Sequence, residues 1–281
     1  MLSSTINLEI VLMFKIPKKV QERFSDRIRH FQKIAEQQKA KDVSEADTVT
    51  VVKDILAEVF GYDKYQELTS EHQIKGTFCD LAIKIDGKLR LLIEVKAAGV
   101  TLNSSHIRQA VSYGVTQGIE WVILTNGINW QVYKIKFGQP PIEEELARFD
   151  FLAINAKNED DMQKIFLLCK EGMTSEALNT YHQVAQLFNK HTVSVILQSE
   201  VVLGALRREM RRIFPELKIE TAGLADLLVN EIIKRDAIDG EKYKEAEARV
   251  KKIIRKLTPA PAKPREATVS TVTITNSDLE Q

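Results

Sequence analysis

TFCDLAIKIDGKLRLLIEVK, residues 77–96, is the stretch that decides the fold of this chain. It contains two strand-forming runs, residues 79–85 and 89–95, with Asp86-Gly87 between them. An Asp-Gly pair between two such runs is a strong signal for a β-hairpin. The stretch therefore predicts two adjacent antiparallel strands.

The apolar pattern of the hairpin indicates which side chains share a face. Side chains alternate between the two faces of a strand, and the odd-numbered positions of both runs are apolar. A two-residue turn would pair Ile85 with Lys88 and set the apolar face of one strand beside the polar face of the other. We therefore expect a three-residue loop, a type I turn with Gly87 in the left-handed conformation. In that register three charged side chains share one face: Asp80, Glu94 and Lys96.

Two carboxylates and an amine on one face suit metal-dependent hydrolysis of a phosphodiester. Carboxylate oxygens are hard ligands that hold Mg²⁺, and the ion polarises the phosphate and lowers the pKa of a bound water. A lysine can orient that water or stabilise the developing negative charge. The alternative is a cross-strand salt bridge on a solvated face, because charged residues are common on exposed sheet faces.

Five motifs follow one another over residues 44–135. They are SEADTVTVVKDILAEVFGYD, the acid of FCD, IEVK, RQAVSY and WVILTNGINWQVY. In this order they resemble the PD-(D/E)xK nuclease superfamily, and within it the N-terminal nuclease domain of type I restriction enzyme motor subunits and their stand-alone relatives. Cys79 stands where the name of the superfamily implies proline. The resemblance implies a restriction-endonuclease-like α/β fold, a mixed sheet flanked by helices.

The resemblance also assigns roles to residues that match the motifs. It implies metal ligation by Asp80, Glu94, the carbonyl of Val95 and Glu45, with Mg²⁺ as the ion and Mn²⁺ as a substitute. Lys96 would orient the attacking water. The predicted catalytic residues are Asp80, Glu94, Lys96, Glu45, Gln109 and Tyr113.

Some of these residues have plainer explanations. Glu45 falls in the first turn of a predicted helix, where an acid complements the helix dipole. Gln109 and Tyr113 are four residues apart and share a helix face, which suits contact with a DNA backbone but also an ordinary exposed surface. Arg108 could add a backbone contact.

The segments around the hairpin predict the rest of the core. Asn103 or Ser104 is expected to cap a helix to about Gln117. Residues 121–124 form a continuous apolar run, typical of a strand buried on both faces. A helix between these strands predicts a crossover and a mixed sheet with helices on both faces. Other expected elements are helices from Pro17 to about Lys41 and from a Ser44 cap to about Phe60, and strands over 71–74, 129–135 and 145–152.

The second half of the chain reads as helical. Helices are expected over 160–172, 175–190, 192–214 and 224–257, the last with a break near Asp239-Gly240. We expect four parts: an N-terminal helical segment (1–43), the nuclease core (44–155), a helical C-terminal unit for homo-oligomer assembly or target contact (156–257) and a flexible tail (258–281).

Four arginines cluster in that helical unit. They are Arg207, Arg208, Arg211 and Arg212. Phosphate is one candidate partner, with Arg207 and Arg211 as predicted nucleic-acid contacts. The other explanation is local neutralisation by Glu200, Glu209 and Glu216.

Composition narrows the class further. The 281 residues carry 40 Lys and Arg against 39 Asp and Glu, a net charge of +1, which argues against a polycationic DNA coat. Two cysteines are too few for a disulfide framework or a zinc site, so we expect a reduced, cytoplasmic protein. Residues 1–14 are too short for a membrane span. No GxxxxGK[ST] phosphate loop occurs, so a motor or target-recognition function would come from a partner protein.

These observations predict a magnesium-dependent DNA endonuclease of restriction or defence type. The alternative is a catalytically silent nuclease fold that binds nucleic acid or acts as an oligomeric scaffold. The same chemistry on RNA cannot be separated by sequence, because both substrates present the same phosphodiester.

Overall fold

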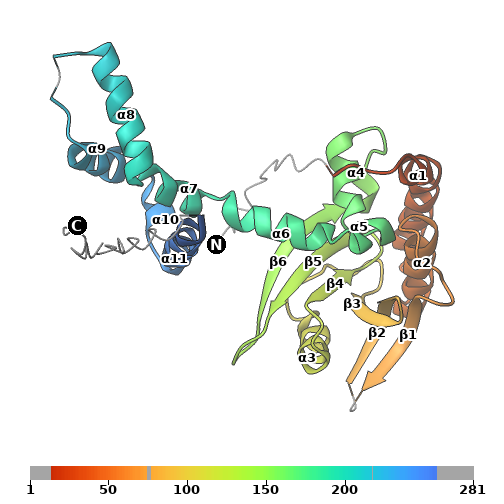
Figure 1. The fold of residues 1–281 in the computed structure, drawn as a ribbon. Helices are drawn as coiled ribbons and strands as arrows, with labels where there is room; N and C mark the ends of the chain where they lie inside the picture. The colour runs from red at the N-terminus through yellow and green to blue at the C-terminus, as the bar shows by residue number, and fades with distance from the viewer. Residues whose placement is uncertain (1–13, 75–76, 217, 258–281) are drawn as a thin grey trace, which may run out of the picture. The chain divides into compact units, whose positions relative to one another are not determined.

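The computed structural model describes residues 14–74, 77–216 and 218–257. One compact unit ends at Phe188 and the other begins at Asn189. The first unit contains a six-stranded sheet in the order β1-β2-β3-β4-β5-β6 (Figure 1). The strands are β1 Leu68–Ile74, β2 Thr77–Ile85, β3 Lys88–Val95, β4 Trp121–Thr125, β5 Asn129–Lys136 and β6 Ile142–Asp150.

The sheet is mixed, as the motif order predicts. β3 and β4 run parallel and every other neighbouring pair is antiparallel. The helix α3 Arg108–Gln117 makes the crossover between the two parallel strands. This arrangement confirms the predicted α/β fold.

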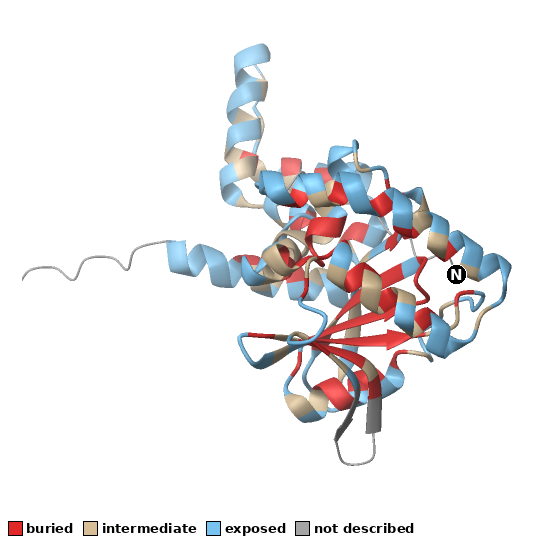
Figure 2. Cartoon of the chain, turned by 90° about the vertical axis from the view of Figure 1, so that its right-hand side faces the viewer, coloured by how far each residue is buried: buried red, intermediate tan, exposed pale blue. Residues whose placement is uncertain are grey.

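Helices cover both faces of the sheet. Val20, Phe24 and other buried residues of α1 Lys18–Ala40 join the core on one face, as do Val52 and Leu56 of α2 Glu45–Glu58. Three later helices add to the same core: α4 Glu159–Phe166, α5 Lys170–Thr174 and α6 Ala177–Leu187. α3 packs on the other face, against Leu92 and Leu124 among others. Figure 2 shows the buried residues concentrated in the strands between these helices.

The hairpin corrects one prediction and confirms another. Ile85 pairs with Lys88, so the loop has two residues rather than three. Asp86 (φ 53°) and Gly87 (φ 71°) both have positive φ, as in a type I′ turn. Gly87 is left-handed as expected. The register shifts by one residue further along, between Ile83 and Lys84, and this bulge restores the match of the two apolar faces.

Some helix boundaries also differ from expectation. Ser44 caps α2 as predicted, since its Oγ accepts from the N–H of Asp47 at 3.2 Å. α3 begins only at Arg108, because Asn103 Oδ1 accepts from the N–H of Ser105 (2.9 Å) and holds a turn instead.

The first unit extends beyond the expected residue 155. Ile165, Phe166 and Leu178 lie in the same core as the sheet, so α4, α5 and α6 belong to this unit. The same core includes α1, the helix expected from Pro17 to about Lys41.

The second unit is wholly helical in its described part. Its core gathers around Leu203, Leu224 and Leu228. The break expected near Asp239-Gly240 is confirmed, and the long helices are divided at further points as well. The elements are α7 Lys190–Leu197, α8 Glu200–Ile213, α9 Thr221–Leu227, a π-helical turn Leu228–Ile232, α10 Arg235–Ile238 and α11 Glu241–Leu257. The expected tail, 258–281, lies outside the described residues. Among the described helices, none combines the length and the apolar character needed to cross a membrane.

Candidate active site

Two paired strands bring Asp80 and Glu94 together. Leu81 of β2 lies opposite Ile93 of β3, so the residues next to them also face one another. Asp80 Oδ2 accepts a hydrogen bond from the N–H of Val95 at 2.7 Å. This bond holds one carboxylate against the strand that carries the other.

Lys96 joins the acids into one cluster. Its Nζ lies 2.7 Å from Glu94 Oε1 and 3.4 Å from Glu45 Oε2. Glu45 opens α2, whose core residues pack on the opposite face from α3. Lys96 reaches it because the lysine lies one residue beyond the end of β3. The structure therefore places Asp80, Glu94, Lys96 and Glu45 at one site, as the sequence predicts.

Burial sets the electrostatics of this cluster. The side chain of Glu94 is only 6% exposed, and burial raises its pKa, while the hydrogen bond from Lys96 opposes the rise and the charge of Asp80 adds to it. Burial alone would lower the pKa of Lys96, but the hydrogen bond and charge of Glu94, followed by Glu45, raise it. Lys96 is therefore a protonated ammonium group that can donate hydrogen bonds but cannot act as a base.

The donor set fits a magnesium ion. In the described residues, no three Asp, Glu, His or Cys side chains form a ready metal-binding group. Mg²⁺ does not need three, because it is commonly held by one or two carboxylates together with waters and substrate phosphate. Asp80 and Glu94 supply two hard carboxylates, and the Val95 carbonyl is the third predicted ligand. Glu45, the fourth, is paired with Lys96.

Two residues that sequence reasoning missed hold the chain after Lys96. Thr48 of α2 is fully buried, and its Oγ1 accepts from the N–H of Ala98 at 3.1 Å. Asn126 donates from Nδ2 to the carbonyl of Val100 at 2.9 Å. A threonine on a buried helix face gives no distinctive sequence signal, whereas Asn126 lies in the TNG motif and was interpreted only as a turn residue.

Gln109 and Tyr113, which share a face of α3, differ in how far they are buried. Gln109 is exposed on α3. Tyr113 is only 1% exposed and lies in the core that also contains Cys79. Burial, and then the charge of Cys79, raise the pKa of Tyr113. Arg108 is exposed at the start of α3. A DNA contact by any of the three stays a prediction.

The arginine cluster lies on α8 of the second unit. Arg212 forms an ion pair with Glu209 at 2.5 Å. Within residues 14–74, 77–216 and 218–257, Arg207, Arg208 and Arg211 have no carboxylate within ion-pair distance. Local neutralisation thus accounts for Arg212 alone, and the role of Arg207 and Arg211 in binding nucleic acid stays a prediction.

Comparison with known families supports the motif analysis. Residues 51–147 match the family described as the type I restriction enzyme R protein N terminus. This confirms the resemblance, and the matched region contains Asp80, Glu94 and Lys96. It indicates a restriction-type, nuclease-class function for this part of the chain. Searches of curated proteins and of solved structures each gave no match.

Proposed function

We propose that this protein is a magnesium-dependent DNA endonuclease of the restriction or defence type. The observation that carries the proposal is the convergence of Asp80, Glu94 and Lys96 where β2 pairs with the end of β3. The similarity of residues 51–147 to the N terminus of type I restriction R proteins supports the same chemistry.

The reaction is hydrolysis of a phosphodiester by in-line attack of water on phosphorus. A bound Mg²⁺ supplies Lewis-acid chemistry, which polarises the phosphate and lowers the pKa of a bound water. Asp80, Glu94 and the carbonyl of Val95 would supply the oxygen atoms that hold this ion. Asp80 is kept in position by its 2.7 Å hydrogen bond from the Val95 N–H.

Lys96 contributes a positive charge next to the scissile phosphate. As a protonated group it donates to the attacking water, or to the phosphate oxygen on which negative charge develops. Glu94 at 2.7 Å and Glu45 at 3.4 Å limit where its ammonium group can lie. Glu45 is thus a positioning residue for Lys96, and its binding of a second metal ion stays a prediction.

The same comparison supports a proposal for the substrate and the partner. DNA is the proposed substrate, with Gln109 and Arg108 of α3 as candidate backbone contacts. Residues 1–281 contain no GxxxxGK[ST] phosphate-binding loop, so we assign no DNA translocation to these residues, and a protein partner that supplies it or chooses the target is part of the proposal. The helical second unit is the proposed surface for that partner or for a second copy of this chain.

A second candidate function rests on the ion pairs of Lys96. The same contacts with Glu94 and Glu45 would stabilise a nuclease fold that binds nucleic acid without cleaving it. The two functions differ in their products, because only the endonuclease converts supercoiled plasmid to nicked or linear DNA.

Plasmid cleavage tests the proposal. The purified chain is incubated with supercoiled plasmid and Mg²⁺ or Mn²⁺, beside an EDTA control, the variant Lys96→Ala and the matched variant Lys88→Ala at an exposed position of β3. We expect nicking that needs the metal, survives in Lys88→Ala and is lost in Lys96→Ala. Plasmid binding without nicking by the wild-type chain would favour the nuclease fold that only binds nucleic acid. A parallel reaction with an RNA substrate tests whether the same site cleaves RNA.

A further inference from the structure

A pocket opens directly beside the candidate active site. It has a volume of about 260 Å³, and its lining begins at Ala98, two residues after Lys96. The lining continues through the segment 98–102 to Asn126 and Gln131, and includes Lys39 of α1 and Arg148 of β6. All of these residues lie in the first unit.

Strand register connects this pocket to Glu94. Glu94 lies beside Leu124, Leu124 lies opposite Gln131, and Gln131 lies opposite Arg148. These side chains thus form one row across four strands, on the face covered by α3. With about 4.8 Å between neighbouring strands, Gln131 stands roughly 10 Å from Glu94. Neighbouring phosphates of one DNA strand lie about twice the 3.4 Å axial rise apart, because they also wind around the helix axis, so roughly 10 Å equals one to two nucleotide steps.

The lining of the pocket is cationic and rich in amides. Lys39 and Arg148 carry positive charge, and no carboxylate lines the pocket. Glu145 lies outside the lining and forms hydrogen bonds with Arg148 at 2.6 and 2.8 Å. Asp42 approaches Gly99 but does not line the pocket either. Arg148 keeps further N–H groups for another acceptor, since a guanidinium has five.

Gln131 is a buried polar side chain aimed into this pocket. It is 6% exposed, and its Oε1 accepts from the hydroxyl of Tyr133 at 2.8 Å. Across the described part of the chain, its Nε2 has no hydrogen-bond acceptor, so its N–H groups are the part offered to the pocket. Because no described side chain has a fully buried polar atom without a partner, this nitrogen is open to solvent and can donate to an anionic oxygen that enters the pocket.

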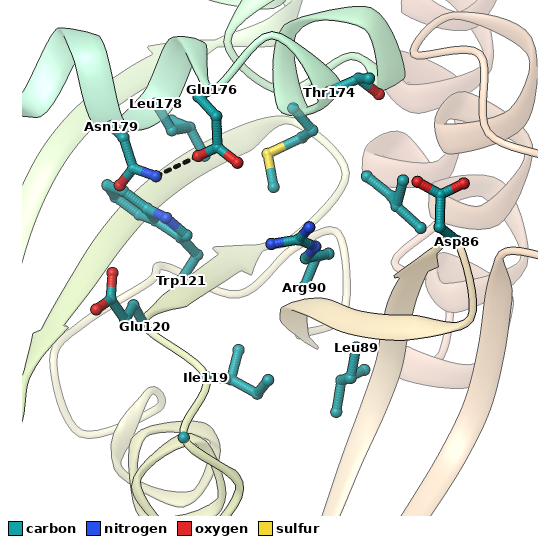
Figure 3. Close-up of a pocket in the computed structure, with 13 residues that line it drawn as sticks. Asp86, Leu89, Arg90, Ile119, Glu120, Trp121, Thr174, Glu176, Leu178 and Asn179 are labelled. Carbon is teal, nitrogen blue, oxygen red and sulfur yellow. Dashed lines mark hydrogen bonds between the residues drawn. The ribbon is translucent and has the colours of Figure 1, made fainter.

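The other pocket of the first unit has the opposite character. Figure 3 shows it at the far end of the strands, beside the β2–β3 turn and the start of β4. Its lining carries three carboxylates, Asp86, Glu120 and Glu176, against the single cation Arg90. A phosphodiester would be repelled there, so of these two pockets the one near Lys96 matches an anionic ligand.

We propose that the pocket lined by Lys39, Gln131 and Arg148 binds a backbone phosphate of DNA one to two nucleotides from the scissile phosphate. The inference rests on the proposed nuclease function of Asp80, Glu94 and Lys96. The ammonium group of Lys39 and the guanidinium group of Arg148 supply charge, and the amide of Gln131 supplies a directed hydrogen bond. The contact fixes the direction in which the strand crosses the sheet.

DNA binding measured without cleavage tests this pocket. Fluorescence anisotropy of a labelled duplex in EDTA gives the affinity over a series of salt concentrations. Four proteins are compared: wild type, Lys39→Ala, Gln131→Met and, as matched control, Lys33→Ala at an exposed position of the same helix that does not line the pocket.

The loss of a charge and the loss of a neutral hydrogen bond change the salt dependence of DNA binding differently. Lys39→Ala is expected to reduce the slope of log affinity against log salt by about 0.9, because one phosphate contact is lost. Gln131→Met is expected to weaken binding about tenfold with the slope unchanged, since the lost donor is neutral. Lys33→Ala should bind as wild type does, and circular dichroism checks that each variant is folded.

The outcomes separate this inference from the nuclease proposal. The proposed phosphate site is wrong if Lys39→Ala binds DNA with the same affinity and the same salt dependence as Lys33→Ala, even if plasmid is cleaved. It is also wrong if the wild-type chain binds no DNA. Lys39-dependent binding without any cleavage would support the pocket and reject the nuclease function. If a deoxynucleoside monophosphate competes as strongly as the duplex, the pocket is a site for free nucleotides and the proposal is wrong.

Discussion

Replacing Thr48 with valine is expected to destabilise the first unit and impair cleavage together. Thr48 Oγ1 accepts from the N–H of Ala98 at 3.1 Å and donates to the carbonyl of Ser44 at 3.0 Å. Valine preserves the shape but removes both bonds. The Ser44 carbonyl still accepts from the N–H of Thr48 at 3.1 Å, so one buried donor, the Ala98 N–H, is left without a partner. An unsatisfied buried donor costs about 1–3 kcal/mol, and we expect a loss of about 2 kcal/mol.

The effect on activity follows from the position of Ala98. This residue is two positions from Lys96, so a shift of its backbone displaces the ammonium group. Misplacement by 1 Å can cost about 100-fold in rate, and we expect nicking to slow by about tenfold or more.

Urea unfolding followed by tryptophan fluorescence measures the loss of unfolding free energy in Thr48→Val. The two tryptophans of the chain, Trp121 and Trp130, both lie in the first unit, so the signal reports on that unit alone. Thr50→Val is the matched control, because Thr50 makes the same backbone bond (to Ala46, 3.1 Å) on an exposed face of α2. Its loss should stay within about 0.5 kcal/mol. Equal unfolding free energies and equal nicking rates in the two variants would refute the reasoning.

Two further predictions concern groups away from the active site. Burial raises the pKa of Cys79 and of Cys169 to about 12. Neither thiol should therefore react with iodoacetamide at pH 8 until urea unfolds the chain. Mass spectrometry detects the labelled cysteines, and rapid labelling of the native protein would contradict this prediction. Hydrogen bonds from His182 and Lys136 lower the pKa of Glu144 to about 2, so the ionised carboxylate stabilises the fold above its unfolded pKa of 4.5 and loses this effect as pH falls toward 2. Glu144→Gln should therefore lower the unfolding free energy at pH 6 by about 1 kcal/mol, a value reduced because the Glu144 side chain is partly exposed. The difference between variant and wild type should shrink below pH 4.5. A difference that is constant with pH would argue against the pairing of Glu144 with His182 and Lys136.

The hairpin shows which parts of the fold a sequence can predict. Alternation of apolar residues predicted correctly that Asp80 and Glu94 share a face, because burial of one face fixes strand register. It did not reveal whether the loop or a bulge absorbs the extra residue. Both solutions give the same pairing near Asp80, and the structure uses a two-residue turn with a bulge beside Ile83. Local chemistry at Asp86-Gly87 favours that shorter turn.

The candidate site likewise contains residues that the sequence reveals and residues that it does not. Asp80, Glu94 and Lys96 could be found because charged residues interrupt an apolar strand pattern. Thr48 could not, since its importance depends on a contact with Ala98, fifty residues away. The burial of Tyr113 depends likewise on how α3 lies against the sheet, which sequence spacing does not determine. The boundary near residue 155 was placed where the pattern changes from strands to helices, but α4 to α6 pack onto the sheet core, and a change of element type does not reveal that packing.

Cleavage by Glu94→Gln tests the central claim most directly. Burial raises the pKa of Glu94, so the ionised carboxylate is unfavourable in the folded chain, and Lys96 keeps Glu45 as a partner. The variant should therefore remain folded with an unfolding free energy no lower than that of the wild type at pH 7. We expect nicking of supercoiled plasmid to fall by about 100-fold or more, while duplex binding in EDTA is unchanged or tighter. Nicking by Glu94→Gln at the wild-type rate would contradict the account, because hydrolysis would then occur somewhere other than this site.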